Sequence, residues 1–296
     1  MKEIVLITGA SGSLARKLKK TLAHSYKIRS LTTKKKDVNG KSIFYWNIKE
    51  NYVDTESLDN CKHIIHLSGY SILKRWTKKN KQLMYESRVN GATLLFNKCQ
   101  ELNIQPSTFI SASATGIYGL TANGIKTEED QIGNDWVAKM ANEWEIAADK
   151  FKKIGSRVIQ MRISLLFSKK SGFLKYNIIS LKYGMGVIIG SKNNIINWIH
   201  IEDAVNFIIT AIKDEKYNGV FNLANQYKVS QERLIQSIKS KISPYALIIR
   251  IPISFIRFFL GDRSLILSSN INLNVEKLYK TGFTFQYNNI EDVLKD

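Results

Sequence analysis

Two glycines near the start of the chain have a spacing suited to binding a phosphate. Gly9 and Gly12 follow the apolar run Ile4–Ile7, and leucines then recur at every fourth residue from Leu14. The run predicts a buried strand, and the leucine stripe predicts a helix. A strand, a glycine turn and a helix N-terminus together present backbone N–H groups and the helix dipole to a pyrophosphate. The sequence therefore predicts that this loop binds a nucleotide.

The glycine spacing is G-x-x-G-x-x-A, which departs from the dinucleotide fingerprint G-x-G-x-x-G. Its first interval is one residue longer, and Ala15 stands where a third glycine would let the helix pack on the strand. Alanine meets that need because only a small side chain is required there. A glycine pair alone also marks ordinary turns, so the flanking strand and helix carry the prediction.

Three hydroxyl groups are placed where chemistry is expected. The segment Thr108–Ala114 predicts a strand that becomes small and hydroxylated at its carboxyl end. Doubly wound sheets bind ligands at that end of their strands. Ser111, Ser113 and Tyr118 are therefore candidate chemical groups. The alternative is that the serines make turn hydrogen bonds and the tyrosine packs in the core.

The end of the second predicted strand, Lys27–Thr32, bears on the choice of cofactor. An acid at that point binds a free ribose 2′-OH, whereas a cation accommodates a 2′-phosphate. Thr33 and Lys34 follow the strand, and the first acid, Asp37, comes too late in the chain to reach the ribose. NADP is therefore favoured over NAD, unless these lysines only line a solvated loop. Asn47, after a third short strand, could reach the adenine.

Strands alternate with helices through residue 224, which predicts a parallel sheet with crossover connections. The fold class is α/β, a Rossmann-like doubly wound sheet with a small, mainly helical C-terminal cap. We expect residues 1–225 to form the dinucleotide-binding domain, with cap contributions from about 170–198, and residues 226–296 the small domain. One long helix is expected from about 77 to 102.

The apolar run Ile253–Leu260, with Arg257 inside it, predicts a helix near the end of the chain. We expect this helix to pack on the sheet as part of the cap. The alternative is a helix lying on a membrane surface.

Composition and charge limit the possible partners. Of 296 residues, 44% are hydrophobic and 23% charged, as in ordinary globular proteins. No apolar run approaches the roughly 20 residues that span a bilayer. The net charge of +19 comes from scattered lysines, and no stacking platform or recognition helix accompanies them. We therefore expect a solvated basic surface, no specific nucleic acid and no membrane as partner.

Cysteine and histidine positions give no sign of a disulfide or a metal site. Cys61 and Cys99 lie far apart, which is typical of reduced, buried thiols. His63 and His66 are separated by an odd number along a strand, so their side chains point to opposite faces. The N-terminus runs directly into the first strand without an apparent signal peptide. We expect a cytoplasmic protein with no metal.

Several motifs occur together in one order along nearly the whole chain. They are Thr8–Gly12, His66–Gly69, Arg75–Thr77, Ser87–Val89, Ser111–Gly119, Trp144-Glu145, Gly184–Gly186, Trp198–Asp203 and Gly282–Phe285. In these motifs the chain resembles the extended short-chain dehydrogenase/reductase superfamily. Within it, the chain resembles the atypical epimerase family branch, whose members are similar to nucleoside-diphosphate-sugar epimerases.

This resemblance implies an NADP-binding domain with a small C-terminal domain over the cleft. It assigns Gly9, Ser11, Gly12, Ser13 and Leu14 to the phosphate loop, and Leu67, Ser68, Gly69 and Arg88 to the rest of the cofactor. Thr33 takes the ribose-phosphate position, where the family usually has arginine, and Lys34 could supply the charge. Beside these, we predict that Asn47 and Ser111 contact the cofactor and that Arg75, Trp76 and Trp198 bind a substrate.

The catalytic residues depart from the wider superfamily, which uses a Tyr-x-x-x-Lys pair. Alignment on Trp144-Glu145 puts Val137 and Ala141 at those two positions, and neither can transfer a proton. Ser113 matches the superfamily serine that hydrogen-bonds the substrate. Tyr118 is the nearby phenol that could donate a proton; with an ordinary pKa of about 10, it would need a cationic neighbour to act as a base.

Lys126 and Arg162 are candidates for that neighbour, and packing or substrate binding is the alternative role for Tyr118. The sequence thus predicts an NADP-dependent oxidoreductase or epimerase-like enzyme that acts on an unidentified small molecule. The alternative is a non-catalytic protein that binds NADP(H) and reports it to a partner. A homo-oligomer is compatible with both.

Overall fold

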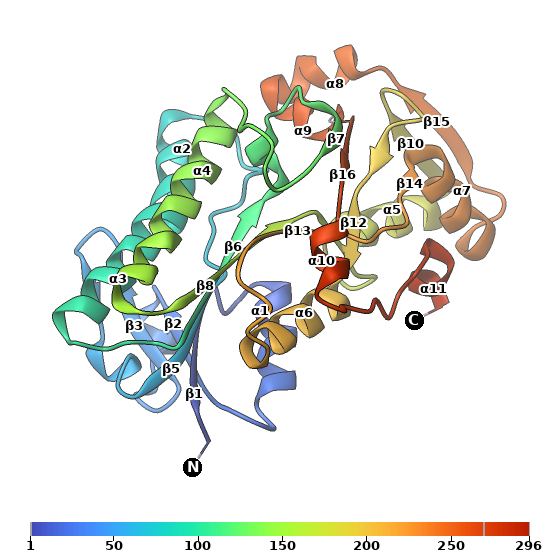
Figure 1. The fold of residues 1–296 in the computed structure, drawn as a ribbon. Coiled ribbons are helices and arrows are strands. Elements are labelled where there is room, and N and C mark those ends of the chain that lie inside the picture. Colours follow the sequence, from blue (N-terminus) through green and yellow to red (C-terminus); the bar gives the residue numbers. More distant parts are fainter. Residues whose placement is uncertain (1, 269, 296) are drawn as a thin grey trace. The chain divides into compact units, whose positions relative to one another are not determined.

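The computed structural model describes residues 2–268 and 270–295, which form two compact units (Figure 1). Unit 1 consists of Met1–Ser113, Lys139–Arg162 and Val205–Val220. Unit 2 consists of Ala114–Ala138, Ile163–Ala204 and Phe221–Asp296. The chain therefore passes between the units several times, and the predicted domain boundary between residues 225 and 226 stays a prediction.

The sheet built on unit 1 has eight strands in the order β13-β8-β6-β5-β1-β2-β3-β4. The strands are β1 (Ile4–Thr8), β2 (Lys27–Thr32), β3 (Ile43–Asn47), β4 (Tyr52–Val53), β5 (Cys61–His66), β6 (Thr108–Ala114), β8 (Arg157–Ile163) and β13 (Gly219–Leu223). β1 pairs in parallel with β2 and β5, β2 with β3, and β5 with β6. This order confirms the Rossmann-like doubly wound sheet.

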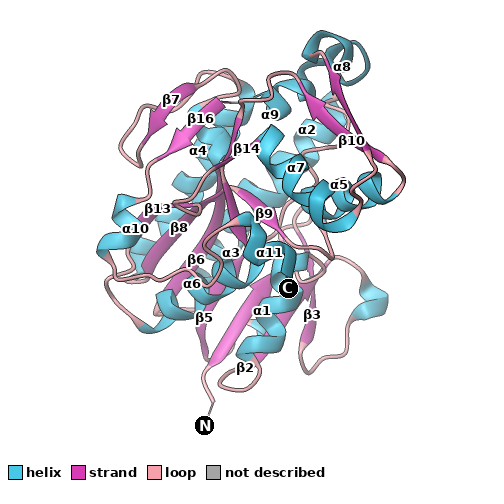
Figure 2. Ribbon diagram, turned by 90° about the vertical axis from the view of Figure 1, so that its right-hand side faces the viewer, coloured by secondary structure: helices cyan, strands magenta, loops and turns pink. Residues whose placement is uncertain are grey.

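Helices cover both faces of the sheet, which explains the unbroken apolar run in β1. The helices that contribute to unit 1 are α1 (Ser13–Leu22), α2 (Lys78–Tyr85), α3 (Gly91–Glu101), α4 (Trp136–Asp149) and α6 (Ile201–Lys213). α1 and α3 lie on opposite faces (Figures 1 and 2). Between β6 and α3, the ring of Phe151 stacks on Phe109 at 3.7 Å and contacts Phe96 at 5.7 Å between centroids.

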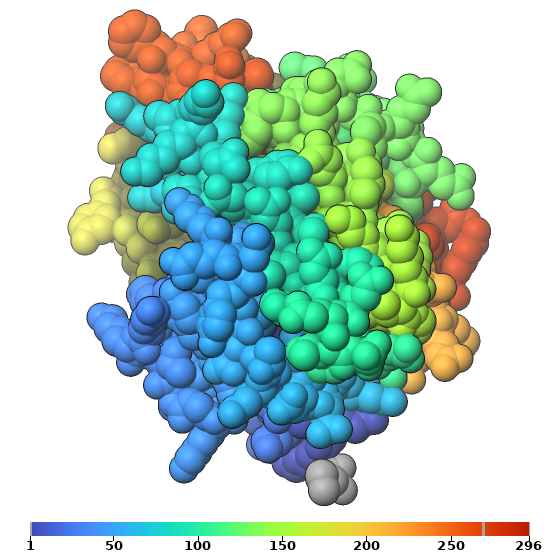
Figure 3. Space-filling model, turned by 90° about the vertical axis from the view of Figure 1, so that its left-hand side faces the viewer, coloured from blue at the N-terminus to red at the C-terminus, as the bar shows by residue number. Residues whose placement is uncertain are grey.

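The long helix predicted over residues 77–102 forms with an interruption. A π-helical segment, Glu86–Asn90, joins α2 to α3. Thr77 caps α2, since its hydroxyl accepts a hydrogen bond from the N–H of Asn80. Residues 78–101 form part of the surface seen in Figure 3, coloured cyan to teal.

The described residues of unit 2 form four short two-stranded ladders and several helices. The ladders pair β7 (Asn123–Lys126) with β16 (Asn270–Leu273), β9 (Leu165–Phe167) with β12 (Trp198–His200), β10 (Met185–Ile189) with β15 (Leu247–Ile251), and β11 (Ile195–Ile196) with β14 (Val229–Ser230). The helices that lie wholly in unit 2 are α5 (Gly172–Lys182), α7 (Gln231–Ile242), α8 (Ile253–Leu260), α9 (Leu265–Ser268), α10 (Glu276–Lys280) and α11 (Ile290–Lys295). Apolar residues of α5, α7 and α11 form a common buried cluster.

The segment before α11 is held by a buried carboxylate. Asp203 accepts hydrogen bonds from the N–H groups of Gln286, at 2.7 Å, and Tyr287, at 3.3 Å. The ring of Tyr287 also lies against His200, with 3.6 Å between centroids. Burial raises the pKa of Asp203 to about 6, although the two N–H donors favour its ionised form.

α8 forms where the sequence predicted a helix, but its packing differs from the prediction. None of its eight residues, all of them described, is buried. The helix is therefore more exposed than expected, with Ile253, Ile256 and Leu260 half-buried, and packing of the cap on the sheet stays a prediction.

Candidate functional site

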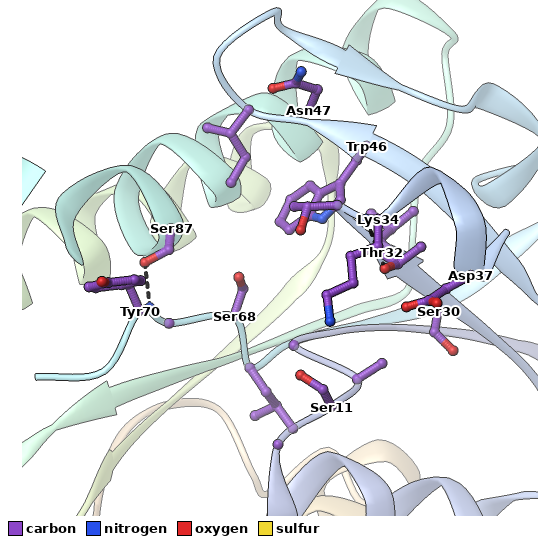
Figure 4. Close-up of a pocket in the computed structure, with 18 of the residues that line it drawn as sticks. Ser11, Ser30, Thr32, Lys34, Asp37, Trp46, Asn47, Ser68, Tyr70 and Ser87 are labelled. Carbon is purple, nitrogen blue, oxygen red and sulfur yellow. Dashed lines mark hydrogen bonds between the residues drawn. The ribbon is translucent and has the colours of Figure 1, made fainter. Parts of the chain in front are cut away.

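Unit 1 contains a cavity of about 930 Å³ beside the carboxyl end of β1. It is lined by residues 9–12 and Lys19, residues 30–34 and Asp37, Ile43 and residues 46–49, residues 67–70, and Leu83, Glu86 and Ser87. In Figure 4, Lys34 and Asp37 lie on one side of the opening, Tyr70 and Ser87 on the other, and Ser11 below Ser68. The cavity thus lies where a doubly wound sheet binds its ligand.

The glycine turn after β1 allows two loops to come into contact. Gly9 has a φ of +66°, and a Cβ atom there would lie 2.4 Å from the carbonyl oxygen of Leu67. No residue other than glycine therefore fits without moving the backbone. Gly12 is the N-cap residue of α1, so the N–H groups of the first helical turn begin at the cavity.

The loop of residues 67–69 is attached to β1 through Thr8. The Thr8 Oγ1 accepts hydrogen bonds from the N–H groups of Leu67 and Ser68, each at 3.1 Å. It also lies 3.0 Å from Nδ1 of His66, whose Nε2 lies 3.0 Å from the carbonyl oxygen of Arg88. That carbonyl only accepts, so Nε2 carries the proton and Nδ1 accepts from the Thr8 hydroxyl. Burial lowers the pKa of His66 to about 4, which keeps the ring neutral.

The π-helical segment holds the other end of this loop. Arg88 Nη1 donates to the carbonyl oxygens of Tyr70, at 2.9 Å, and Met84, at 3.1 Å. Ser87 Oγ accepts from the N–H of Tyr70 at 2.7 Å, as the dashed line in Figure 4 shows. The Arg88 guanidinium also lies over the ring of Trp144, 5.3 Å from its centroid. Burial lowers the pKa of Arg88 to about 10, so it stays charged at neutral pH.

The charged residues around the cavity are mostly basic. Lys19, Lys34 and Lys49 line it together with Asp37 and Glu86. Asp37 is in the lining because the 3-10 turn Lys35–Asp37 brings it there, and the expectation that it does not reach the ribose stays a prediction. Three cations against two acids leave a net positive charge facing a ligand.

Most of the residues predicted to bind a cofactor line this cavity. They are Gly9, Ser11, Gly12, Thr33, Lys34, Asn47, Leu67, Ser68 and Gly69. Ser13 and Leu14 form the start of α1 beside the cavity, and Leu14 is buried. Arg88 supports the loop through its contacts with Tyr70 and Met84, and Ser111 is buried on β6, where its hydroxyl donates to the carbonyl of Ala112 at 2.9 Å. Cofactor contact stays a prediction for these four residues and for the nine in the lining.

Several lining residues were missed by the sequence. Lys19 lies about two helical turns after Gly12, a spacing that could have placed it on the same side of α1. Tyr70 directly follows the predicted loop. Glu86 and Ser87 come from the π-helical segment, for which helical periodicity gives no signal.

Ser113 belongs to a buried ionic cluster in unit 1. Its hydroxyl donates to Glu145 Oε1 at 2.6 Å. Arg162 donates from Nε to Oε1 and from Nη2 to Oε2 of the same carboxylate, each at 2.9 Å. This bidentate contact is the strongest hydrogen-bonding geometry of an arginine–carboxylate pair. Since the single proton of Ser113 points to Glu145, its oxygen presents lone pairs to any further partner.

Tyr118 is buried in unit 2, on the 3-10 turn Thr115–Tyr118 after β6. Its hydroxyl lies 2.9 Å from the carbonyl oxygen of Thr127 and 2.6 Å from Oδ1 of Asn222. The amine of Lys126, a predicted cationic neighbour, lies 3.7 Å from a carboxylate oxygen of Asp130. These two oxygen atoms are acceptors, so the hydroxyl can donate its proton to either of them within unit 2. A role as proton donor stays a prediction.

The predicted substrate residues lie in different settings. Arg75 is exposed, and Trp76 is half-buried with its indole N–H donating to the carbonyl of Ile72 at 2.9 Å. Trp198 is 1% exposed in unit 2, where its ring stacks on Phe167 at 5.2 Å between centroids. This is the environment of a core residue. Contact of the three with a substrate stays a prediction.

Comparisons with known proteins agree with this geometry. The profile of the NAD dependent epimerase/dehydratase family matches residues 5–224. An epimerase family protein of Staphylococcus epidermidis is 30% identical over 301 residues, which cover 98% of this chain and 97% of the relative.

Two solved structures share the fold over nearly all of both chains. The human epimerase family protein SDR39U1, solved with NADPH, has a TM-score of 0.85 at 21% identity and covers 99% of this chain and 98% of its own. The UDP-glucuronic acid 4-epimerase of Bacillus cereus, solved with UDP-glucuronic acid and NAD, has a TM-score of 0.79 at 14% identity and covers 99% and 96%. These likenesses confirm the Rossmann-like fold.

Proposed function

Because the chain belongs to the NAD dependent epimerase/dehydratase family, as an atypical extended short-chain dehydrogenase/reductase, we propose that the cavity of unit 1 binds NADP(H). The protein would then be an oxidoreductase or epimerase-like enzyme for a small polar substrate. The observation that carries this proposal is one cavity that combines the Gly9–Gly12 turn, the N-terminus of α1 and three lysines.

The charge around the end of β2 supports NADP(H) over NAD(H). The two cofactors differ by the 2′-phosphate, which needs a cation beside the adenosine ribose. Lys34 directly follows Thr33 there, and Lys19 and Lys49 add positive charge to the same cavity. Asp37 opposes this preference, because an acid favours the free 2′-OH. The balance of three cations to two acids supports the phosphate.

We infer that Ser113 orients the substrate, because it matches the serine that does so in the wider superfamily. A bound nicotinamide supplies the hydride chemistry. The Ser113 oxygen, with its proton directed to Glu145, accepts a hydrogen bond from a substrate hydroxyl. Val137 and Ala141, aligned with the usual tyrosine and lysine, are both buried and apolar, so Tyr118 is the candidate for proton transfer.

Retention of the proton of Tyr118 by buried acceptors favours a second candidate function. If no group near the nicotinamide can transfer a proton, the protein binds NADP(H) without turnover and signals its binding to a partner.

Thermal unfolding with each dinucleotide tests the cofactor. A ligand that binds only the folded protein raises the unfolding midpoint. We expect a larger rise with NADPH than with NADH, and Lys34→Ala should abolish the difference. Lys36→Ala is the matched control, because this neighbouring exposed lysine does not contribute to the cavity lining. If the midpoint rises with none of NADP, NADPH, NAD and NADH, the result contradicts the proposal.

Hydride exchange tests catalysis. Deuterium at C4 of NADPH should appear in the alcohol formed from one member of a panel of carbonyl compounds. Ser113→Ala should slow that transfer by about a hundredfold, the usual contribution of a positioned hydrogen-bonding group. Binding of NADPH without exchange across the panel supports the sensor instead.

A further inference from the structure

Unit 2 exposes several large apolar side chains on α8 and on the strands that precede it. Phe255, Phe258 and Phe259 on this helix are all exposed, and Phe258 is exposed to 84%. α8 follows β15 after Pro252 and lies near the end of the β10–β15 ladder (Figures 1 and 2). Six of the eight residues of α8 are apolar, and a helix so rich in apolar residues normally has a buried face, which α8 does not.

The β10–β15 ladder extends this surface. In its register, Met185 is opposite Leu247 and Gly186 is opposite Ile248. Ile248 packs against the buried cluster of unit 2, so residues on either side of it along the strand point away from the core. Leu247 is accordingly exposed to 72%, and Met185 and Ile249 are exposed beside it. We call Met185, Leu247, Ile249, Phe255, Phe258 and Phe259 the apolar face.

Basic residues accompany the apolar face. Residues 176–191 and 243–263 contain four basic residues and one acid, Asp262. Lys182, Arg250 and Arg257 are exposed, and Asp262 lies 3.5 Å from Arg257. These residues belong to a chain whose net charge is +19. Apolar side chains bordered by cations match the chemistry of an anionic lipid surface.

We propose that the apolar face binds to the surface of a membrane that contains anionic lipids. α8 lies in the plane of the headgroups, its phenylalanines enter the boundary of the acyl chains, and the basic residues contact lipid phosphates. No helix within residues 2–268 and 270–295 is long and apolar enough to cross a membrane, so this binding is peripheral.

A second copy of the chain fits this surface less well. A two-fold contact through the apolar face would bring Arg250 and Arg257 of both copies together in a poorly solvated interface. Each copy also carries a net charge of +19, which opposes association. Lipid phosphates supply the missing negative charge. The sequence predicted a packed helix and no membrane partner, and the exposure of α8 is the reason to revise that expectation.

Flotation of the full chain with vesicles tests the proposal. We expect binding to vesicles of phosphatidylcholine with phosphatidylglycerol, and weak binding to vesicles of phosphatidylcholine alone. Phe258→Ser should weaken binding about tenfold, as expected from the loss of one buried aromatic side chain. Arg257→Gln should weaken it about fivefold, an effect that salt should reduce. Tyr52→Ser, on an exposed aromatic residue of unit 1, is the matched control and should bind like the unaltered chain.

Three outcomes would overturn the proposal. They are absence of binding to the anionic vesicles, equal binding by Phe258→Ser and the unaltered chain, and a dimer in sedimentation that Phe258→Ser dissociates. Circular dichroism of each variant verifies that the fold is kept. The thermal response to NADPH is measured separately, and its failure would leave this test of α8 unaffected.

Discussion

In each unit, a buried ionisable side chain takes part in the hydrogen bonds that hold a loop. In unit 1, His66 contacts Thr8, which in turn holds the N–H groups of residues 67 and 68. In unit 2, Asp203 accepts directly from the N–H groups of Gln286 and Tyr287. Burial lowers the pKa of His66 to about 4 and raises that of Asp203 to about 6, so both move toward the neutral form.

The two sites differ in what their hydrogen bonds require. Neutral histidine has one donor and one acceptor, which the carbonyl of Arg88 and the hydroxyl of Thr8 match. The network under the cavity is therefore complete at neutral pH. Asp203 is ionised at that pH and accepts two N–H groups, but its burial opposes the charge. Acid should consequently weaken unit 1 and strengthen unit 2.

The largest effect should come from the close contact of two loops in unit 1. Gly9→Ala places a Cβ atom 2.4 Å from a carbonyl oxygen, so it should lower the free energy of unfolding by at least about 3 kcal/mol. It should also abolish the thermal response to NADPH. Gly184→Ala in unit 2 has a similar positive φ but nothing within 4 Å, and should cost about 1 kcal/mol. Urea unfolding measures both, and equal losses would contradict the argument.

Acidification should destabilise unit 1 through His66. The ordinary pKa of 6.5 applies to the unfolded chain and a pKa of about 4 to the folded chain, so the unfolded chain binds more protons between these values. The free energy of unfolding should fall by about 3 kcal/mol as the pH falls from 6.5 to 4. Hydrogen exchange at residues 67 and 68 measures this, and His66→Asn should remove most of the pH dependence.

The opposite slope is expected for unit 2. The folded pKa of Asp203, about 6, lies above its ordinary value of 3.8, so the folded chain binds the proton first. Its contribution to stability should rise by about 2 kcal/mol as the pH falls from 6 to 4. Hydrogen exchange at Gln286 and Tyr287 tests this. An exchange rate there that increases in acid together with that of residues 67 and 68 would refute the contrast between the units.

The smallest effect is expected on α8. Phe258→Ser should change the free energy of unfolding by no more than about 0.5 kcal/mol, because the side chain it removes is 84% exposed. Urea unfolding without lipid measures this. A loss of about 2 kcal/mol or more would mean that Phe258 packs in the folded protein.

Periodicity was sufficient to predict most of the elements that carry the site. The apolar run of β1 and the leucine stripe of α1 formed as expected, and the turn between them lies at the cavity. These features depend on the local sequence, because the regular spacing of apolar residues determines which face of a strand or helix is buried. The nine predicted cofactor residues in the lining follow strands that end at one edge of the sheet, and most of them were assigned from the family resemblance.

Other features depend on information that the sequence does not express locally. The π-helical segment Glu86–Asn90 is set by tertiary contacts of Ser87 and Arg88, which no helical repeat indicates. Asp37 reaches the cavity because a short 3-10 turn shortens its path. The exposure of α8 was missed because an apolar helix is usually buried, and whether another element covers it is decided by the whole fold.

The Thr8 hydroxyl makes the loop beside Gly9 open as one cooperative unit. A single oxygen, which itself donates to His66, accepts from two successive N–H groups, so the loop cannot leave without breaking both of its hydrogen bonds to Thr8. Leu67 and Ser68 should therefore share one opening event and one exchange rate. The loop is ordered before any ligand arrives. The conformational entropy lost in ordering it is therefore part of the free energy of folding and does not reduce the affinity for the ligand.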